Sequence, residues 1–424
     1  MRQLYSLLIL LLLPLLLLRL YWRGFRAPAY RERWQERLGK LRAPAGPGCI
    51  WVHAVSVGEV QAASLLIRRL MASYPQLPMV ITTTTPTGAQ RVKELFGDQV
   101  THYYGPFDAP FIVRRFFECL KPSLLILMET EIWPNLIHQA GEHGVPSLLA
   151  NARLSVRSAR RYHRVAGLTR ETLQRISLIA PHGESDGERF RALGARSSQV
   201  EVTGSIKFDI HLPASLRERA DVLRREWGTE RPVWLAASTH EGEDEQVLEA
   251  HGRIKRQVPE ALLVLVPRHP ERFDQVADLA IAMGFKVVRR SEGLACRADT
   301  DVFLGDTMGE LTLFLGAADA AFIGGSLVPH GGHNLLEAAA QGVPVVFGPH
   351  MFNFTEISEL FLSRQAAVQV ADGVELASLV GGWLQSASER SRIGENGRAL
   401  LDRNRGALQR LTGLVARLMD QRNS

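Results

Sequence analysis

From Ile50 onward, short apolar runs alternate with longer amphipathic stretches. The apolar runs are rich in Val, Ile and Leu, as buried parallel strands are, and the stretches between them have helical periodicity. A first series of runs lies at 50–55, 78–85, 124–131, 146–153 and 178–184. A second series lies at 232–239, 261–270, 286–291, 301–307, 320–326 and 344–350. This alternation predicts an α/β protein with parallel strands and crossover helices.

The two series predict two Rossmann-like domains, which we expect to face each other across a cleft. Turn-forming residues gather between the series in Val202–Pro213. A chain of 424 residues also exceeds what one core normally holds. We place the first domain at 50–205 and the second, with a closing helix, at 206–424. The closing helix, about Ala399 to Met419, could also pack back toward the first domain.

An almost unbroken apolar run, Leu4–Leu20, precedes the first domain and has about the minimum length that spans a bilayer. Many arginines and no small-residue cleavage site follow it, which argues against a cleaved signal peptide. Tyr21 and Trp22 suit the headgroup region, and the positive-inside rule places the C-terminal side in the cytoplasm. We therefore expect a single anchor at 1–22, spanning or deeply monotopic, and a basic interfacial segment at 23–49.

The net charge of +6 is concentrated just after the anchor and between Arg153 and Arg170. Local concentrations of this kind predict local interfaces and no nucleic-acid partner. Cys49, Cys119 and Cys296 are too few and too scattered for a disulfide framework, which favours a reducing compartment. The sequence has no G-x-G-x-x-G after the first run and no Walker A motif, which argues against a nicotinamide dehydrogenase or a P-loop enzyme.

A carboxylate, Glu59, stands at the corner that follows the first apolar run, in Ser56-Val57-Gly58-Glu59. One explanation is a helix cap, because the free N–H groups and the dipole of a helix start attract negative charge. The other is a general base, because open α/β sheets bind ligands at the carboxyl ends of their strands. The corner alone leaves both explanations open.

Two short patterns raise the question of a metal. Asp299-Thr300-Asp301 resembles the Asp-x-Asp of some nucleotide-sugar enzymes, but it precedes a strand in a polar loop, where we expect a surface turn. His330 and His333 have ligand spacing but no third ligand nearby. We therefore predict no metal site and no cofactor.

Three loops at strand ends of the second domain carry groups suited to a nucleotide. Arg268 can donate to a phosphate, and the turn at 305–311 exposes main-chain groups for a base. A glycine-rich loop then leads to Asn334 and Glu337, which share a helix side suited to ribose hydroxyls. The three loops together predict a nucleotide site in this domain.

Eight motifs, in this order, resemble those of the 3-deoxy-D-manno-oct-2-ulosonic acid (Kdo) transferases of lipopolysaccharide synthesis: HAVSVGE, METEIWPNL, NARLS, TGSIKFD, STHEGE, PRHPERF, GDTMGEL and GGHNLLEAAAQGVPVVFGP. The resemblance implies the two-Rossmann GT-B glycosyltransferase fold. It further implies CMP-Kdo as the donor, the lipid A precursor (lipid IVA) as the acceptor, and catalysis without a bound metal at the cytoplasmic face of the inner membrane.

The resemblance also implies roles for single residues. Glu59 becomes the base that accepts the proton of the acceptor hydroxyl, with inversion at the sugar, and we expect its pKa to be ordinary or lowered. The other residues expected at the reacting centre are Glu129, Thr130, Glu131 and Lys207. The residues expected to contact CMP are Pro267, Arg268, His269, Met308, Gly309, Glu310, Ser326, Asn334, Leu335, Leu336 and Glu337.

Two sets of residues are expected on the acceptor side. His53, Ser56 and Gly58 would shape the corner at Glu59. Arg157 and Arg161 belong to a run of arginines whose spacings of three and four place many of them on one helix face. That face is either solvated or a seat for the phosphates of the acceptor, which suit arginine.

Two further functions are compatible with this sequence. One is another GT-B enzyme, such as a transferase or epimerase that uses a UDP-sugar. The other is a membrane-tethered module that binds a nucleotide without turnover. Stabilisation by CMP but not UDP would argue against the first, and release of CMP from CMP-Kdo would argue against the second.

Overall fold

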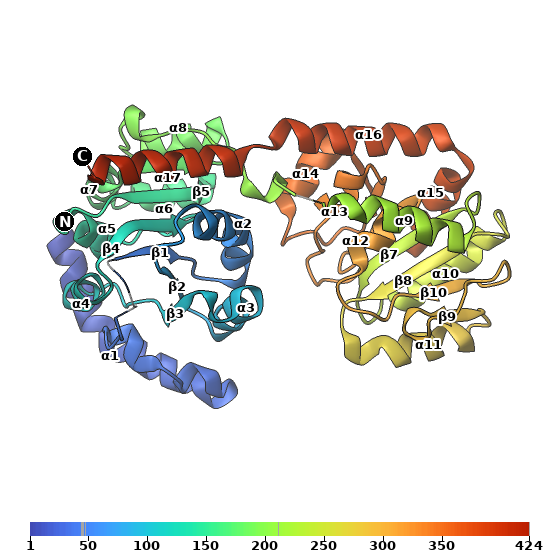
Figure 1. Cartoon of the computed structure of the whole chain (residues 1–424), viewed down its shortest axis with the longest axis horizontal. Coiled ribbons are helices and arrows are strands. Elements are labelled where there is room, and N and C mark those ends of the chain that lie inside the picture. Colours follow the sequence, from blue (N-terminus) through green and yellow to red (C-terminus); the bar gives the residue numbers. More distant parts are fainter. Residues whose placement is uncertain (44–45, 47, 211, 424) are drawn as a thin grey trace. The chain divides into compact units, whose positions relative to one another are not determined.

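The chain folds into two compact units, each built on one parallel sheet (Figure 1). The computed structural model describes residues 1–43, 46, 48–210 and 212–423. Unit 1 consists of Met1–Asp209 and Asn404–Ser424, and unit 2 consists of Ile210–Arg403. Two α/β units with parallel sheets confirm the predicted fold class.

Unit 1 has a six-stranded sheet in the order β3-β2-β1-β4-β5-β6. Because successive side chains of a strand point to opposite faces of the sheet, β1 contributes to two apolar clusters. Trp51 packs with Phe116 on one face, and Ile50 packs with Leu66 on the other. The strand order reverses between β1 and β4, which is where open α/β sheets bind ligands. The strands are β1 (Cys49–His53), β2 (Met79–Thr83), β3 (Thr101–Tyr104), β4 (Pro122–Met128), β5 (Ser147–Ala152) and β6 (Leu178–Pro181).

Helices follow the strands of unit 1 as the alternating pattern predicted. Five of them begin after a strand end with a proline or a capping hydroxyl; Ser56, for example, caps α2, and Thr85 caps α3. The helices that lie between strands are α2 (Val57–Ser73), α3 (Pro86–Phe96), α4 (Pro110–Leu120), α5 (Pro134–Glu142), α6 (Val156–His163) and α7 (Ala166–Arg175). α8 (Glu184–Ala192) follows β6.

The C-terminal helix α17 (Ala407–Asn423) belongs to unit 1, whereas we had placed the whole C-terminus in the second domain. Its apolar side, which includes Leu411 and Val415, is buried in the same cluster as Ile50 of β1. Asp209 also accepts hydrogen bonds from the backbone N–H groups of Gly406 (2.6 Å) and Leu408. Burial of this apolar side explains the correction, and unit 2 is therefore shorter than predicted at both ends.

Unit 2 has a seven-stranded parallel sheet in the order β13-β12-β11-β7-β8-β10-β9, so its first strand is central and the order reverses between β11 and β7. The strands are β7 (Val233–Thr239), β8 (Leu262–Pro267), β9 (Val287–Arg289), β10 (Val302–Leu304), β11 (Ala320–Ile323), β12 (Val345–Phe347) and β13 (Ala367–Gln369). The helices are α9 (Ala214–Trp227), α10 (Asp244–Lys255), α11 (Phe273–Ala282), α12 (Leu311–Ala317), α13 (Leu336–Gln341), α14 (Thr355–Ser363), α15 (Gly373–Gln385) and α16 (Ala387–Asn404).

The sequence pattern missed β3 and β13, one in each unit. Both are edge strands of three or four residues. β3 reads THYY and β13 reads AVQ, so neither contains the continuous apolar run that marks a strand buried on both sides. Every other predicted run contains an observed strand.

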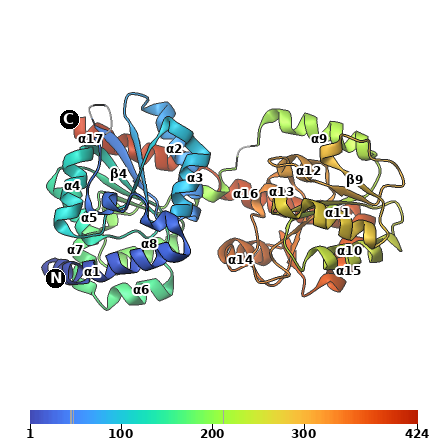
Figure 2. The same ribbon diagram turned by 90° about the horizontal axis from the view of Figure 1, so that it is seen from below.

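The N-terminal helix α1 (Arg2–Arg26) lies against unit 1 along one stripe of its surface (Figure 2). Ile9 and Leu13 pack against the apolar cluster that contains Trp51, and the buried Ser6 donates to Asn135 Oδ1 (2.9 Å). α1 is long and apolar enough to cross a membrane. Its other side exposes Leu4, Leu7, Leu8, Leu11, Leu15, Leu18 and Trp22.

Candidate functional site

The carboxyl ends of β1 and β4 bring Glu59 and the Glu129–Glu131 bend to the point where the strand order of unit 1 reverses. Glu59 lies in the first turn of α2 and is only 8% exposed. Its Oε2 accepts from the N–H of Val55 (2.8 Å) and its Oε1 accepts from Ser56 Oγ (3.0 Å), while Ser56 Oγ accepts from the Glu59 N–H (3.3 Å). Ser56 therefore caps α2, and the Glu59 carboxyl bonds the two residues before the helix, so the capping explanation accounts for part of its position.

The environment of Glu59 does more than cap the helix. Burial, and after it the negative charges of Glu131 and Glu129, raise the pKa of Glu59 to about 8, although the hydrogen bonds from Val55 and Ser56 act in the opposite direction. We had expected an ordinary or lowered pKa, and this expectation is wrong because the carboxyl is out of water and beside a second carboxyl. A carboxyl with a pKa near the working pH can accept and release a proton, as a general base must.

The METE segment forms a tight bend after β4. Glu129 has a left-handed backbone (φ 53°), which is uncommon for a residue other than glycine. Thr130 Oγ1 donates to the Arg153 carbonyl (2.6 Å), and Trp133 Nε1 donates to Glu131 Oε2 (2.5 Å). Burial raises the pKa of Glu131 as well. The bend therefore places a second, indole-bonded carboxyl close enough to Glu59 to shift its pKa.

The three corner residues are placed differently from one another. Ser56 caps α2, and an added Cβ at Gly58 would meet only Ser56 Oγ, at 3.9 Å. His53 is fully buried; its Nδ1 lies 2.8 Å from Thr82 Oγ1, its ring meets Trp133 edge to face, and burial lowers its pKa to about 4. His53 therefore supports the corner from behind.

Lys207 and the two arginines lie on other elements of unit 1. Lys207 lies in a 3-10 turn, Ile206–Phe208, close to His182 at the end of β6. Burial lowers the pKa of His182, and the positive charges of Lys207 and Arg153 add to this effect, so that the pKa is about 4. Arg157 and Arg161 are exposed on α6. Tyr162 of the same helix reaches the Thr130 carbonyl (3.5 Å), so α6 lies beside the METE bend.

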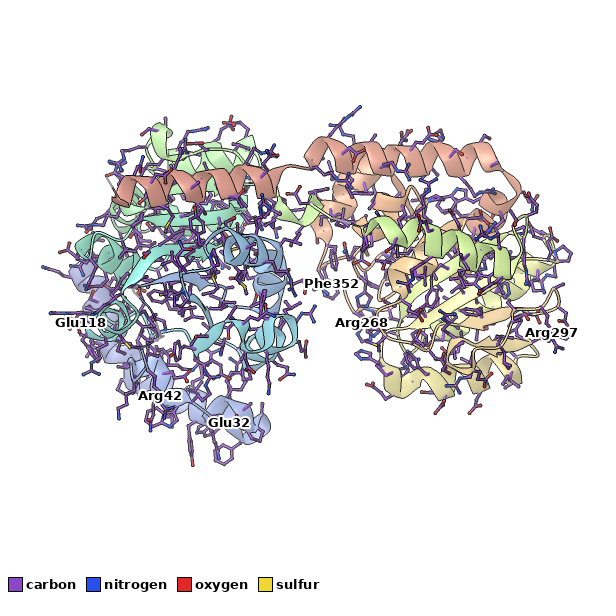
Figure 3. All side chains as sticks on the ribbon, viewed as in Figure 1. Glu32, Arg42, Glu118, Arg268, Arg297 and Phe352 are labelled. Carbon is purple, nitrogen blue, oxygen red and sulfur yellow. The ribbon has the colours of Figure 1, made fainter. Side chains whose placement is uncertain are left out.

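In unit 2, Arg268 and His269 follow the end of β8 and are exposed. The Arg268 N–H donates to the Thr239 carbonyl (3.0 Å), which fixes the loop to the end of β7. Figure 3 shows Arg268 at one edge of unit 2 and Arg297 at the opposite edge. The exposed guanidinium at the carboxyl ends of the strands suits the predicted role of Arg268 as a hydrogen-bond donor to the nucleotide phosphate.

The GDTMGEL turn is exposed at Met308 and Gly309, but its Glu310 carboxylate is bonded within unit 2. Met308 is 65% exposed and Gly309 has a φ of 82°. The Glu310 carboxylate accepts two bonds from the Arg290 guanidinium, of 2.9 and 3.1 Å, and the pair lowers the pKa of Glu310. We had expected this turn to contact the base of the nucleotide. Because the Glu310 carboxylate is bonded to Arg290, we expect any such contact to come from the backbone of Glu310.

The glycine-rich loop leads to α13 with one polar pair. Asn334 Nδ2 donates to Glu337 Oε1 (3.1 Å), and Asn334 Oδ1 accepts from the Leu336 N–H (3.1 Å). Burial raises the pKa of Glu337. The side chains of Ser326, Leu335 and Leu336 are buried, so of these predicted contacts only Asn334 and Glu337 present polar side chains that are partly exposed.

Sequence reasoning missed a buried carboxylate that joins two of these loops. Glu243, fully buried before α10, accepts from the N–H groups of His240 (3.0 Å), Gly325 (2.6 Å), Ser326 (2.9 Å) and Leu327 (2.8 Å). The STHEGE motif marks this residue, but three of its four donors come from a loop more than 80 residues away in the chain. Glu243 therefore fixes the loops after β7 and β11 against each other.

A histidine cluster at the same place was also missed. His240 Nε2 lies 2.8 Å from His333 Nε2, the His330 ring stacks on His240 at 4.2 Å between centroids, and the His269 ring lies 5.4 Å away. We had assessed His330 and His333 only as a metal pair. In the part of the chain that the structure describes, no group of three or more His, Cys, Asp or Glu side chains could hold a metal ion.

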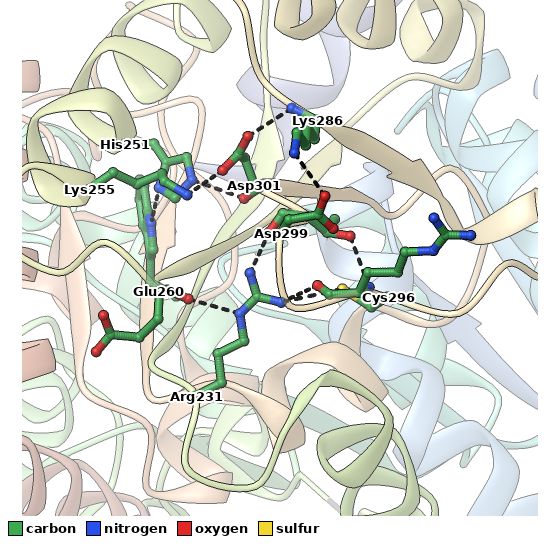
Figure 4. A network of polar contacts seen from close by, with 11 residues as sticks. Arg231, His251, Lys255, Glu260, Lys286, Cys296, Asp299 and Asp301 are labelled. Carbon is green, nitrogen blue, oxygen red and sulfur yellow. Dashed lines mark hydrogen bonds and ion pairs between the residues drawn. The ribbon is translucent and has the colours of Figure 1, made fainter.

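Asp299 and Asp301 lie in the loop before β10, at the amino end of the strands and not at the nucleotide loops. Lys286 Nζ donates to Asp299 (2.8 Å), and Lys255 is ion-paired with Asp301 (Figure 4). The Lys286 N–H also donates to Asp301 Oδ2 (2.8 Å). Both carboxylates are paired with lysines; Asp299 is exposed in a turn as expected, whereas Thr300 is buried and the side chain of Asp301 is only 14% exposed.

Comparisons with known proteins show the family to which the chain belongs. A family model described as 3-Deoxy-D-manno-octulosonic-acid transferase (kdotransferase) matches residues 32–210. The 3-deoxy-D-manno-octulosonic acid transferase of Haemophilus influenzae is 46% identical over 420 residues, which cover 98% of each chain. The crystal structure of the C-terminal CMP-Kdo binding domain of WaaA from Acinetobacter baumannii is 34% identical, covers 45% of this chain and 99% of that one, and has a TM-score of 0.43.

A further solved structure shares only the fold. The UDP-GlcNAc 2-epimerase from Neisseria meningitidis, bound to UDP-GlcNAc, covers 88% of this chain and 100% of that one with a TM-score of 0.55. Its sequence identity of 12% is too low to say anything about chemistry. The likeness confirms the GT-B type of architecture.

Proposed function

This chain belongs to the 3-deoxy-D-manno-octulosonic acid (Kdo) transferase family, and we propose that it transfers Kdo from CMP-Kdo to a sugar hydroxyl of the lipid A precursor, with Glu59 as the base. The observation that carries the proposal is the buried Glu59 carboxyl at the end of β1, with a pKa of about 8. A cap needs no such pKa, whereas a proton acceptor benefits from one near the working pH.

The reaction requires one bond to form and one to break at the anomeric carbon of Kdo. The acceptor oxygen attacks that carbon, its proton passes to Glu59, and the bond to the CMP phosphate breaks with its electron pair on the phosphate. Attack from the face opposite the leaving phosphate inverts the centre. Negative charge grows on the phosphate, so cationic groups at the donor site stabilise the transition state.

We place the donor site in unit 2, at the loops after β7, β8 and β11. Arg268 supplies the phosphate with a guanidinium, and the Asn334–Glu337 pair faces the ribose. The site contains no candidate metal ligand set among the described residues, and we predict that activity survives excess EDTA. Abolition by the chelator with rescue by Mg²⁺ would contradict this arrangement.

Arg268→Ala and Glu337→Ala are each expected to weaken CMP binding about tenfold or more, because hydrogen bonds that involve charged groups contribute about 1.5–3 kcal/mol. Calorimetric titration of the full chain with CMP measures the effect. Arg297→Ala is the matched control, since Arg297 is an exposed arginine at the opposite edge of unit 2 (Figure 3). Unchanged CMP affinity in both test variants would place the nucleotide elsewhere.

Two measurements separate this function from its alternatives. Thermal stabilisation by CMP but not by UDP distinguishes the donor from a UDP-sugar. Mass spectrometry of the lipid formed from CMP-Kdo and the lipid A precursor distinguishes transfer from binding alone. A protein that binds CMP and forms no modified lipid would be a binding module.

We propose that α1 holds unit 1 on the cytoplasmic face of the inner membrane, lying in the interface without crossing it. One side of α1 is attached to unit 1 through Ser6, Ile9 and Leu13, so only the opposite, apolar side is available to lipid. The first half of α1 is attached in this way, so a crossing helix would have to draw that part of unit 1 into the bilayer. In this position, unit 1 could reach the sugar hydroxyl of the acceptor while the acyl chains of the acceptor stay in the membrane.

Arg157 and Arg161 are proposed to seat the phosphates of the acceptor. The double charge reversal Arg157→Glu/Arg161→Glu is expected to raise the KM for the lipid about tenfold or more at low salt, less at high salt, and to leave the KM for CMP-Kdo unchanged. Steady-state kinetics at two ionic strengths measure this. If the lipid KM is unaltered at low salt, the basic side of α6 is only solvated surface.

A further inference from the structure

The histidine cluster of unit 2 combines rings from loops that are far apart in the chain. His240 follows β7, and His330 and His333 follow β11, the two strands between which the strand order reverses. Gly325 makes room for the pair, because a Cβ there would lie 3.2 Å from the His333 ring and 3.4 Å from the His240 ring. Glu243 fixes both loops through backbone N–H groups. The cluster is therefore built into the fold.

The distance between the two Nε2 atoms determines how many protons the pair carries. At 2.8 Å only one hydrogen fits between them, donated by one ring to the lone pair of the other. One of the two Nδ1 atoms of a neutral pair then has no proton. That nitrogen can accept a proton without breaking the bond between the rings, so the pair can change from neutral to singly positive in the same geometry.

Without a ligand, the surroundings keep the pair neutral. The pKa of His240 is lowered to about 4, mainly by burial and then by the charges of His330, His269, Arg272 and Arg268. The pKa of His333 is also lowered to about 4, mainly by burial and then by the charges of His240, Arg268, His269 and His330. The nearby carboxylates already have partners. Glu243 accepts from backbone N–H groups, and Asp244 accepts from Thr239 and is ion-paired with Arg272. Glu271 lies 3.8 Å from His269, and Glu337 accepts from Asn334.

On the basis of the proposed donor site, we propose that His240 and His333 form a proton-sharing pair that takes up one proton when the phosphate of a cytidine nucleotide binds. An opposite charge within about 4–6 Å raises the pKa of a histidine by about 1–3 units. The pair then supplies positive charge beside Arg268 when the phosphate is present and releases it when CMP leaves. His240 and His333 are in this view positioning residues for the nucleotide phosphate.

Proton uptake on binding tests the proposal. CMP is titrated into the full chain in detergent at pH 6, 7 and 8, each in two buffers of different ionisation enthalpy, so that the difference in measured heat gives the protons taken up. With a pKa that rises from about 4 to about 5–7, the wild-type protein is expected to take up about 0.1 to 0.9 proton more at pH 6 than His240→Gln or His333→Gln, and nearly the same number at pH 8. CMP affinity at pH 6 is expected to fall by up to about tenfold in both variants and to change little at pH 8.

Several controls separate the possible outcomes. The phosphate of free CMP titrates near pH 6 in every titration alike, so the difference between proteins reports the protons held by the complex. Uncharged cytidine should show no difference in uptake, and His163→Gln, an exposed histidine of α6, should behave as wild type. Equal uptake in the wild type and both variants would overturn the proposal while leaving the donor site intact. Absence of CMP binding to the wild type would overturn the donor site as well.

A measurement on the wild type avoids dependence on variants that fail to fold. The ¹⁵N shifts of the imidazole nitrogens distinguish a protonated ring from a neutral one. Saturating CMP at pH 6 is expected to move one ring of the pair to the protonated position. If the shifts of His240 and His333 do not change with CMP, the pair stays neutral and the proposal is wrong.

Discussion

Glu59→Gln is expected to lower Kdo transfer at least about a hundredfold while leaving the fold and CMP binding nearly intact, because an amide keeps an acceptor for the Val55 N–H but cannot take a proton.

Because the raised pKa of Glu59 leaves only about a tenth of the molecules ionised at pH 7, wild-type kcat/KM should rise about tenfold per pH unit up to about pH 8 and then level.

Glu131→Gln is the matched comparison. Burial is the largest cause of the raised Glu59 pKa, and the Glu131 charge is the next. Removing that charge should move the rising part of the pH profile to lower pH without abolishing turnover. Retention of a tenth or more of the activity in Glu59→Gln would reduce Glu59 to a helix cap.

Glu243→Gln is expected to destabilise unit 2 by about 3 kcal/mol or more and to weaken CMP binding more than about tenfold. The carboxylate accepts four backbone N–H groups and is fully buried, and an amide would point its own N–H₂ at some of them. Each buried donor left without a partner costs about 1–3 kcal/mol.

Thermal unfolding and CMP titration of the same protein measure the two effects. Glu245→Gln, which changes an exposed carboxylate in the first turn of α10, is the control and should change neither quantity. An unchanged unfolding temperature in Glu243→Gln would mean that the two loops keep their arrangement without the carboxylate.

Local patterns predicted most of the strands, because a strand buried on both faces needs an apolar run. They also predicted where the candidate groups lie, because the end of a strand is visible in the sequence: Glu59 and Arg268 each follow one. They did not predict the pKa of Glu59, since its burial and its neighbour Glu131 depend on β1 and β4 being adjacent in the sheet.

The histidine pair shows the same limit more clearly. His240 and His333 are separated by 93 residues and meet only because β7 and β11 are neighbours in the sheet. A motif such as HGGHN suggests ligands within one loop, which led us to assess His330 and His333 together and to leave His240 out. The order of the strands, which no local pattern contains, decides which side chains meet.

The return of α17 to unit 1 has a consequence for synthesis on the ribosome. Unit 2 is an insertion in unit 1, and residues 1–209 emerge first with the apolar face of their sheet lacking Leu411 and Val415. Unit 2 can fold as it emerges, since its chain is continuous, whereas unit 1 must wait for the last residues to be made. A nascent chain released before residue 404 would therefore expose the uncovered face of unit 1 to chaperones and proteases.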